Sequence, residues 1–552
     1  MCHDPYHATR CLIPPSPQLR ERLRDELERL NSALPMGPML KVTQPDRPGL
    51  NDGLILPGNY FPIETPLERV RNAASERAPL RGALRVIVVL VDFPDRKMDQ
   101  QNDRAHFQQV FFSRGALPGG SVAEYFTEVS HGLVDIVGDV VGPFTLPKNI
   151  TEYANGESGT GNAFPNARTM ARHAAELANA AVDFAPYDND GNGFVDAFIV
   201  IHAGKGAEVT GHRNDIWSHK WVLPNGEYNA DGTKIYAYLT VPEDARIGVC
   251  CHELGHLLFG WPDLYDIDGS SEGLGNWCLM AGGSWNGNGE VPAQPSAWCK
   301  AQQGWVNVVN QTRSELLTIP DVKDAHTVYR FWKDGAQGRE YFLAENRQRR
   351  SYDRLLPGDG LLIYHIDEAV ATNADERHPK VALVQADGRQ DLNNGMNRGD
   401  AGDPFPGAAN NRSFISTTTP NSKSYGGLPT GVSITEISQS GPRMTARVAV
   451  RPLVIAKPRP YISFFDWLRT ATVETGVARP RDVPPHLLRK LLAQYNIETG
   501  LRVGSEELGL DTDWQRSIED RLDAIQTELT ELREGLRGAL VGGVTVGDEA
   551  AI

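Results

Sequence analysis

The sequence predicts an α+β protein made of several structural units. Its 552 residues exceed what one ordinary hydrophobic core holds, so length alone indicates three or four units. Upstream of residue 250, apolar strand-like runs alternate with amphipathic helical patterns. After about Trp305, short alternating runs separated by Gly, Pro and Asn are typical of an antiparallel β-sandwich. We therefore expect four parts: an N-terminal segment at 1–80, an α/β domain at 81–310, a β-sandwich at 311–452, and a linker with a helical, coiled-coil-like tail at 453–552.

The charge balance and the apolar pattern exclude some partners. The net charge of −15 argues against nucleic acid and anionic membrane surfaces. The longest apolar runs are shorter than the roughly 18 residues that a membrane span needs, so we expect no membrane span. The first residues also lack the basic-then-apolar pattern of a secretory signal.

The N-terminal segment combines one predicted helix with proline-rich loops. From Pro17 to Asn31 an apolar face recurs at helical spacing, formed by Leu19, Leu23, Leu27 and Leu30. Cys2 and Cys11 precede this helix, and a thiolate reaching a metal would block it, but an unpaired terminal cysteine without a role is the simpler interpretation. The segment is interpreted as pro-region-like.

The α/β domain opens with a buried strand. The run RVIVVLVD, from Arg85 to Asp92, is continuously apolar, as in a parallel sheet covered on both faces. Ser121 and Glu124 then form a predicted capping box at the start of a helix. A helix at about Ala167–Ala181 and a strand at Ala197–His202 complete the alternation.

An acidic run, DNDGNGFVD, lies just before the second strand. Its alternating oxygens and following glycine match the first half of a calcium loop, although Ile199 stands where a bidentate Glu is expected. We expect a shortened calcium site, and an Asp/Asn-Gly turn without metal is the alternative. The ligands would be the side chains of Asp188, Asp190, Asn192 and Asp196 with the carbonyl of Phe194.

The stretch CHELGHLLFGWPDLYDID, residues 251–268, contains the candidate metal-binding and catalytic residues. His252, Glu253 and His256 spell H-E-x-x-H, which on a helix stacks two imidazoles on one face, where both can bind a zinc ion. Glu253 beside the metal can take a proton from water and pass it to the leaving amine of a peptide. Gly260 and Pro262 would end the helix and turn the chain back.

The sequence pattern alone does not decide which residue is the third zinc ligand. The chain reversal delivers Asp263, and Asp266 and Asp268 follow in the same oxygen-rich run. Glu272 or Glu290, further along the chain, is the other interpretation. His202 and His219 have no assigned ligand role, because a core hydrogen bond or a hydrogen bond to a metal ligand explains each of them. Tyr265 could donate to the oxyanion or pack the loop, and it is not assigned.

These residues, together with GNWCLMAGGSW at 275–285, resemble the immune inhibitor A family of bacterial zinc metallopeptidases, a metzincin-like group. The family pattern H-E-x-x-H-x-x-G-x-x-D implies zinc ligands at His252, His256 and Asp263, with Glu253 as general base and Met280 in the Met-turn. Phe259 is one residue more than the pattern has. The resemblance implies a metzincin-like domain, secretion, and a match that covers most of residues 85–450.

Cysteine usage does not fix the compartment. Cys278 and Cys299 flank the Met-turn loop and could form a disulfide. Cys250 and Cys251 are adjacent, which is more typical of buried reduced thiols.

The C-terminal third contains one acidic loop and one heptad pattern. The acids of the loop DGRQDLNNGMNRGDAGDPFPG suit either a second calcium ion or a solvated rim: Asp387, Asp391, Asp400 and Asp403. Residues 514–536 carry apolar positions at spacings of four and three, which favours helix-mediated self-association or docking on the rest of the chain.

The function predicted from these observations is zinc-dependent endopeptidase activity on protein or peptide substrates, with one catalytic zinc and structural calcium. The alternative from a different class is a calcium-stabilised binding or surface-interaction protein with a non-catalytic zinc site.

Overall fold

The computed structural model describes residues 13–22, 25, 47–450, 491–492 and 495. The chain divides into two units, Met1–Pro452 and Leu453–Ile552, and the account below concerns the first. Residues 17–22 and 25 are helical, as predicted. The other positions of that predicted helix, Cys2, Cys11 and the heptad at 514–536 lie outside the described residues.

Among the described helices, none combines the length and the apolar character that crossing a bilayer requires.

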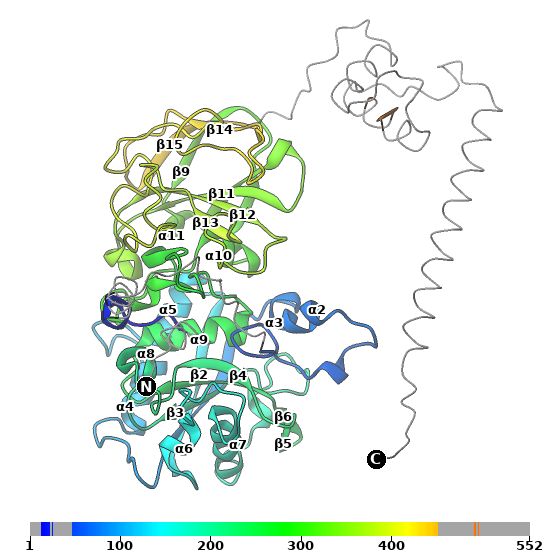
Figure 1. Cartoon of the computed structure of the whole chain (residues 1–552), viewed down its shortest axis with the longest axis vertical. Helices are drawn as coiled ribbons and strands as arrows, with labels where there is room; N and C mark the ends of the chain where they lie inside the picture. Colours follow the sequence, from blue (N-terminus) through cyan, green and yellow to red (C-terminus); the bar gives the residue numbers. More distant parts are fainter. Residues whose placement is uncertain (1–12, 23–24, 26–46, 451–490, 493–494, 496–552) are drawn as a thin grey trace, which may run out of the picture. The chain divides into compact units, whose positions relative to one another are not determined.

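A five-stranded sheet in the order β2-β1-β3-β7-β4 forms the centre of the α/β part (Figure 1). The predicted strand at Arg85–Asp92 is confirmed as part of β1, which pairs in parallel with β2 and β3. Strand β7 continues the parallel order, and β4 is antiparallel at the edge. The strands are β1 Gly82–Asp92, β2 Val134–Thr145, β3 Phe198–His202, β4 His219–Val222 and β7 Ala237–Pro242, with a separate hairpin of β5 Tyr228–Ala230 and β6 Thr233–Ile235.

Helices cover both faces of this sheet. In Figure 1, α5 and α9 lie on the side of the β-rich part, and α6 and α7 on the opposite side. The predicted capping box of Ser121 and Glu124 is confirmed at the start of α5, and α7 ends at Ala178, short of the predicted Ala181. The helices are α2 Leu67–Arg71, α3 Ala73–Glu76, α4 Arg104–Phe112, α5 Val122–Val129, α6 Ile150–Ala154, α7 Ala167–Ala178, α8 Ala207–Thr210, α9 Ile247–Phe259 and α10 Ala297–Gln302.

The β-rich part contains two sheets. The first has the order β13-β12-β11-β10-β8 and the second β14-β15-β9. All neighbouring pairs are antiparallel except β8 with β10, which is parallel because β9 and α11 intervene between them. The expectation of purely antiparallel pairing is therefore wrong at this edge. The elements are β8 Asn307–Asn310, β9 Glu315–Pro320, α11 Val322–Ala325, β10 Thr327–Trp332, β11 Glu340–Arg347, β12 Gly360–Asp367, β13 Val381–Leu383, β14 Val432–Thr435 and β15 Arg443–Val450.

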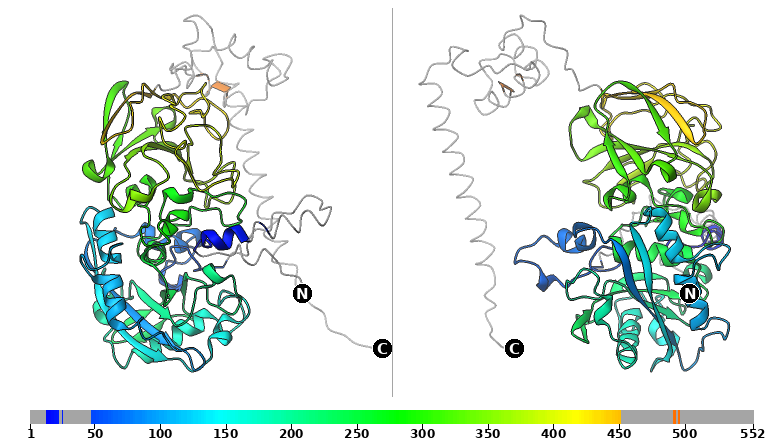
Figure 2. Two further views of the ribbon diagram at one scale, coloured as in Figure 1. Left: turned by 90° about the vertical axis from the view of Figure 1, so that its left-hand side faces the viewer. Right: turned by 180° about the vertical axis from the view of Figure 1, so that it is seen from behind.

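Strands β11 and β12 are buried on both faces. Tyr341 and Leu343 belong to the hydrophobic cluster of the α/β part, whereas Phe342 and Ala344 belong to a second cluster shared with β9, β14 and β15. Because side chains alternate along a strand, this sheet lies between the α/β part and the second sheet. Figure 2 shows the β-rich part against the α/β part from two further sides.

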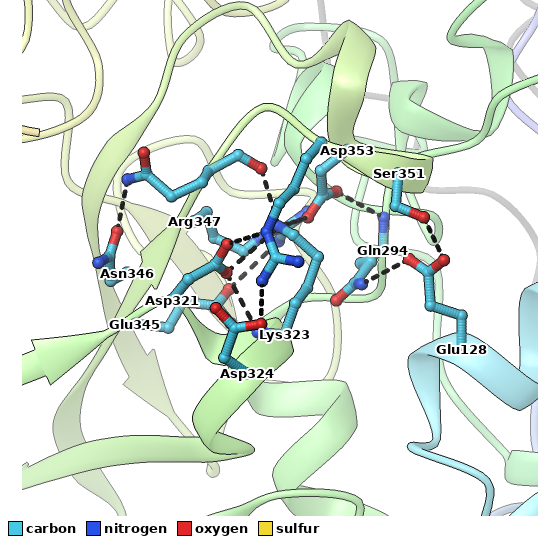
Figure 3. Close-up of polar contacts among 12 residues, drawn as sticks. Glu128, Gln294, Asp321, Lys323, Asp324, Glu345, Asn346, Arg347, Ser351 and Asp353 are labelled. Atoms are coloured by element: carbon cyan, nitrogen blue, oxygen red, sulfur yellow. Dashed lines mark hydrogen bonds and ion pairs between the residues drawn. The ribbon is translucent and has the colours of Figure 1, made fainter. Parts of the chain in front are cut away.

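A buried polar network joins the β11-containing sheet of the β-rich part to the loop around residues 275–294 (Figure 3). Arg347 is fully buried, and its guanidinium donates to Asp353, to Glu345 at 3.2 Å and to the Trp277 carbonyl at 3.4 Å. Asp353 also accepts from the Gln294 amide at 3.0 Å. Buried ion pairs and hydrogen bonds therefore hold the loop against the β-rich part.

The predicted disulfide between Cys278 and Cys299 is not formed. Both cysteines are buried and free. Ser296 donates its backbone N–H to the Cys278 sulfur at 3.3 Å and its hydroxyl to the Cys299 sulfur at 3.4 Å, so hydrogen bonds replace the bridge. Cys250 and Cys251 are buried thiols, as predicted.

Candidate metal centre and active site

Helix α9 carries the histidine motif in a fully buried position. Every residue from Ile247 to Phe259 is buried. Gly260 ends the helix with a left-handed φ of 65°, which confirms the predicted stop and is favourable for glycine. His252 and His256 lie one turn apart on the same face of the helix.

Backbone carbonyls orient both histidine rings. His252 donates from Nδ1 to the Leu279 carbonyl at 3.0 Å, and His256 donates from Nδ1 to the Trp261 carbonyl at 2.5 Å. A carbonyl can only accept, so in each neutral ring the proton is on Nδ1 and the lone pair is on Nε2. This outer hydrogen bond is the one that metal-binding histidines make.

The two free nitrogens and one carboxylate oxygen meet at a single point. The Nε2 atoms lie 3.1 Å apart, and Asp263 Oδ1 lies 3.2 Å from His252 Nε2 and 3.1 Å from His256 Nε2. Three acceptors without a proton between them repel one another unless a cation lies among them. Two imidazoles and one carboxylate are a usual zinc donor set, so these residues fit that metal.

Phe259, the extra residue of the motif, lengthens α9 by one position. Its ring lies 4.9 Å from that of Trp305 and 5.0 Å from that of Trp261, inside an aromatic cluster. The turn at Gly260 then returns the chain so that Asp263 still faces the histidines. The insertion therefore adds core contacts and does not move the carboxylate away.

Glu253 is fully buried, and neither carboxylate oxygen has a hydrogen-bonding partner among the described residues. Burial raises the pKa of Glu253 well above its usual value, the charges of Asp263 and Glu208 add to the increase, and the charge of Lys220 opposes it. A buried carboxylate without a partner needs water or substrate to hydrogen-bond.

Met280 lies directly against the histidine helix. A Cβ atom at Gly255, between the two histidines, would lie 2.6 Å from the Met280 sulfur. The Met280 carbonyl accepts from the Leu264 amide at 2.7 Å, which connects this turn to the residue after Asp263. Glycine at 255 is therefore what allows the methionine to approach the helix face that carries His252 and His256.

The other acidic ligand candidates lie elsewhere. Glu272 forms ion pairs with Arg20 and Arg398 at 2.9 and 3.7 Å. Glu290 is half exposed and pairs with Arg246 at 3.3 Å. Asp266, a third candidate, caps its own turn, because its carboxylate accepts from Asp268 N and Ser270 Oγ.

His219 makes the core hydrogen bonds that were expected, to the Trp217 carbonyl and the Tyr238 hydroxyl at 2.6 and 2.9 Å. His202 is buried and donates from Nδ1 to the Ala203 carbonyl at 3.0 Å. The Tyr265 ring lies 6.4 Å from that of His252.

The predicted calcium loop brings three carboxylates within 4.8 Å of one another, those of Asp188, Asp190 and Asp196. Arg77 already donates to two of them, at 3.2 Å to Asp190 and 2.7 Å to Asp196. Asn192 Oδ1 accepts from the Phe194 amide at 2.9 Å, so this side chain caps the turn. Within the described residues, the acids of the 387–403 loop form no comparable group.

A contact that the sequence did not predict lies beside the metal centre. Residues 47–54 run along β4, and Asn51 Nδ2 lies 3.4 Å from Asp263 Oδ2. The Lys220 amide donates to Asn51 Oδ1, and the Lys220 carbonyl accepts from the Asn51 amide. Nothing in the sequence around Lys220 indicates a partner 169 residues away.

A helix that presents two oriented histidines, a facing carboxylate and a buried glutamate has the residue set of the H-E-x-x-H metallopeptidase motif. Residues 81–310 match the family model of the immune inhibitor A peptidase M6 catalytic domain. The resemblance noted from the motifs is thereby confirmed for this part of the chain.

Two curated relatives support the same class. The pre-pro-metalloprotease PrtV of Vibrio cholerae serotype O1 (strain ATCC 39315 / El Tor Inaba N16961) is 30% identical over 298 aligned positions, which cover 43% of this chain and 32% of the relative. Immune inhibitor A of Bacillus thuringiensis subsp. alesti is 28% identical over 289 positions, 42% of each chain. The similarity therefore spans about a third of the first relative and about two fifths of the second.

Proposed function

We propose that this chain is a zinc-dependent endopeptidase in which His252, His256 and Asp263 hold the metal and Glu253 is the general base. The observation that carries the proposal is the convergence of three acceptor atoms within 3.2 Å beside a buried glutamate without a hydrogen-bonding partner. The family match and the close approach of Met280 to Gly255 on the histidine helix support it.

Each residue has a distinct part in peptide hydrolysis. Bound zinc would polarise the scissile carbonyl and lower the pKa of water. Glu253 accepts a proton from that water and delivers it to the departing nitrogen. The carbonyls of Leu279 and Trp261 hold the two rings in the orientation that metal binding requires.

Replacing the base tests this assignment. We expect Glu253→Ala to retain zinc at wild-type stoichiometry but to lose peptide cleavage by at least about 100-fold, because general-base catalysis contributes on that order. Metal analysis and cleavage of an unfolded protein substrate measure the two effects. Glu176→Ala, at an exposed position of α7, is the control and should change neither. Undiminished cleavage by pure Glu253→Ala protein rejects the assignment.

The alternative function gives a different pattern in the same assay. A calcium-stabilised binding protein would retain zinc and bind a protein partner in fixed stoichiometry, without turnover by the wild-type chain. Removing zinc with a chelator would then leave binding unchanged.

We also propose that the segment 1–80 acts as a pro-region and that β4 with the metal centre is the surface it covers. The contact between Asn51 and Asp263 and the pairing of Asn51 with Lys220 support this role. A rise in peptide cleavage when the chain is cut within 1–80 is expected, and equal activity of the intact and cut chains argues against it.

The acidic loop remains our proposed calcium site, with Asp188, Asp190 and Asp196 as its carboxylates. Because Arg77 contacts two of these residues, calcium binding there has to displace its guanidinium. Calorimetric titration with calcium should therefore give tighter binding for Arg77→Ala than for the wild type, and an absence of binding in both contradicts the site.

A further inference from the structure

Lys220 occupies an unusual position on the edge strand of the central sheet. Its side chain is fully buried, and the strand β4 that carries it has β7 on one side only. Lys220 also lies one residue from the proposed metal ligands, because its amide donates to Asn51, whose side-chain amide lies 3.4 Å from Asp263 Oδ2.

Every described acceptor of this ammonium comes from one short segment. Lys220 Nζ donates to the carbonyls of Gly49 and Leu54 at 3.1 and 2.6 Å and to Asp52 Oδ1 at 3.1 Å. The segment thus supplies two backbone carbonyls and one carboxylate. No residue of the α/β core provides a hydrogen bond to Nζ within the described part of the chain.

The same segment also forms hydrogen bonds with the backbone of Lys220. The Asn51 amide donates to the Lys220 carbonyl at 3.1 Å, and Asn51 Oδ1 accepts from the Lys220 amide at 3.0 Å. Edge strands bind extended peptides through these outward-facing groups, with pockets beside the strand reading the side chains. Asn51 therefore lies where a peptide backbone would pair, and the next acidic residue, Asp52, reaches the ammonium.

Physical chemistry limits what can replace this segment. A buried ammonium without acceptors costs several kcal/mol, so an occupant of the same place has to supply them. A carboxylate is the strongest partner, since hydrogen bonds between charged groups are about twice as strong as neutral ones. An apolar side chain would remove this acceptor, a neutral amide would accept more weakly, and a basic side chain would repel the ammonium.

We propose that Lys220 determines specificity, selecting substrates with an aspartate or glutamate next to the scissile bond, and that Asp52 holds this position in the intact chain. The inference rests on the proposed peptidase function and names the substrate class of that same site. It differs from a purely structural role, in which Lys220 only anchors residues 49–54 and substrate choice does not depend on it.

The test uses the full chain with Asp52→Asn, which removes the competing carboxylate while keeping Lys220. Matched peptides carry Asp or Asn at each position from two before to two after the scissile bond. We expect kcat/KM for the best Asp peptide to exceed that of its Asn partner by about tenfold or more, the range of a charge-assisted hydrogen bond. Lys220→Met in the same chain should bring this ratio close to one, and Lys220→Arg should preserve the preference.

A matched control separates this effect from net charge. Lys148→Met removes one positive charge at an exposed position of the chain, where Lys148 pairs with Glu152 on the surface, and should leave the ratio unchanged. A ratio near one in the Asp52→Asn chain, or an unchanged ratio in Lys220→Met, overturns the inference.

A binding measurement keeps the inference separate from the proposed function. If no peptide is cleaved by any variant, the peptidase proposal fails. The affinities of the same Asp and Asn peptides for the Asp52→Asn chain with Glu253→Ala then decide the role of Lys220. If Lys220→Met does not fold, the Lys220→Arg and Asp52→Asn chains still decide it, because equal binding of both peptides contradicts the inference.

Discussion

Arg347 shows how much depends on a single buried charge in this protein. Its guanidinium is enclosed between Glu345 and Asp353, and it also reaches the Trp277 carbonyl ahead of the Met280 turn. Although burial opposes ionisation, the charges of Arg347 and Lys323 hold the pKa of Asp353 well below its usual range. Removing one member therefore leaves the others charged and without compensation.

We expect Arg347→Met to lower the free energy of unfolding by about 3–5 kcal/mol, the usual cost of breaking a buried ion pair. Urea unfolding measures this change. Arg354→Met, at an exposed position in the same turn, is the control and should stay within about 0.5 kcal/mol of the wild type. Equal stability of the two variants would mean that the network contributes little.

At the scale of elements, local sequence signals predicted the helix that carries the histidines and the residues that end it. His252 and His256 follow from helical spacing, and Gly260 is a recognisable stop. The place of Met280 near the histidine helix was expected only from family resemblance, and its close approach to Gly255 was not predicted, because the two residues are far apart in sequence. The Arg77 contact with the acidic loop was not predictable, since no local pattern links residues 113 positions apart.

Two turns that belong to different parts meet through stacked histidine rings. His131, between α5 and β2, lies 3.3 Å from His326, between α11 and β10, measured between ring centroids. Burial is the main cause that lowers the pKa of His131 to about 3, and the charges of His326 and Lys300 add to it. The folded state therefore excludes a proton that the unfolded chain binds below about pH 6.5.

This exclusion gives stability a pH dependence with a definite sign. Stability is full above about pH 6.5 and decreases as the pH falls toward 3, because only the unfolded state gains the proton. We expect His131→Asn, which suits the left-handed φ of 57°, to lose less of its unfolding temperature between pH 7.5 and pH 5 than the wild type does. Thermal unfolding in a Glu253→Ala background measures this difference, and equal losses in both chains would exclude a role of His131.

At the scale of the whole molecule, the α/β part and the β-rich part share one core. Leu362 and Tyr364 of β12 belong to the same hydrophobic cluster as α9, while Leu361 and Ile363 face the second sheet. The sequence indicated strands in this region, but alternation alone could not reveal that both faces of β11 and β12 are covered. That depends on contacts between distant segments.

A chain limited to residues 81–310 should consequently be unstable. It would keep the proposed metal ligands but lose the apolar side chains of β11 and β12 and the charges of Arg347 and Glu345. We expect it to be insoluble or to bind a hydrophobic dye, in contrast to a chain that ends at residue 450. A soluble 81–310 fragment with cooperative unfolding would contradict the shared core.

The pairing of Asn51 with β4 has one more consequence, for how copies of the chain behave toward each other. A strand with unpaired amides and carbonyls along one side is a template for any other extended chain, including a second copy. Residues 47–54 occupy the outward-facing amide and carbonyl of this strand at Lys220. Loss of this cover through cutting or substitution would thus favour aggregation at high protein concentration, unless peptide occupies the strand in its place.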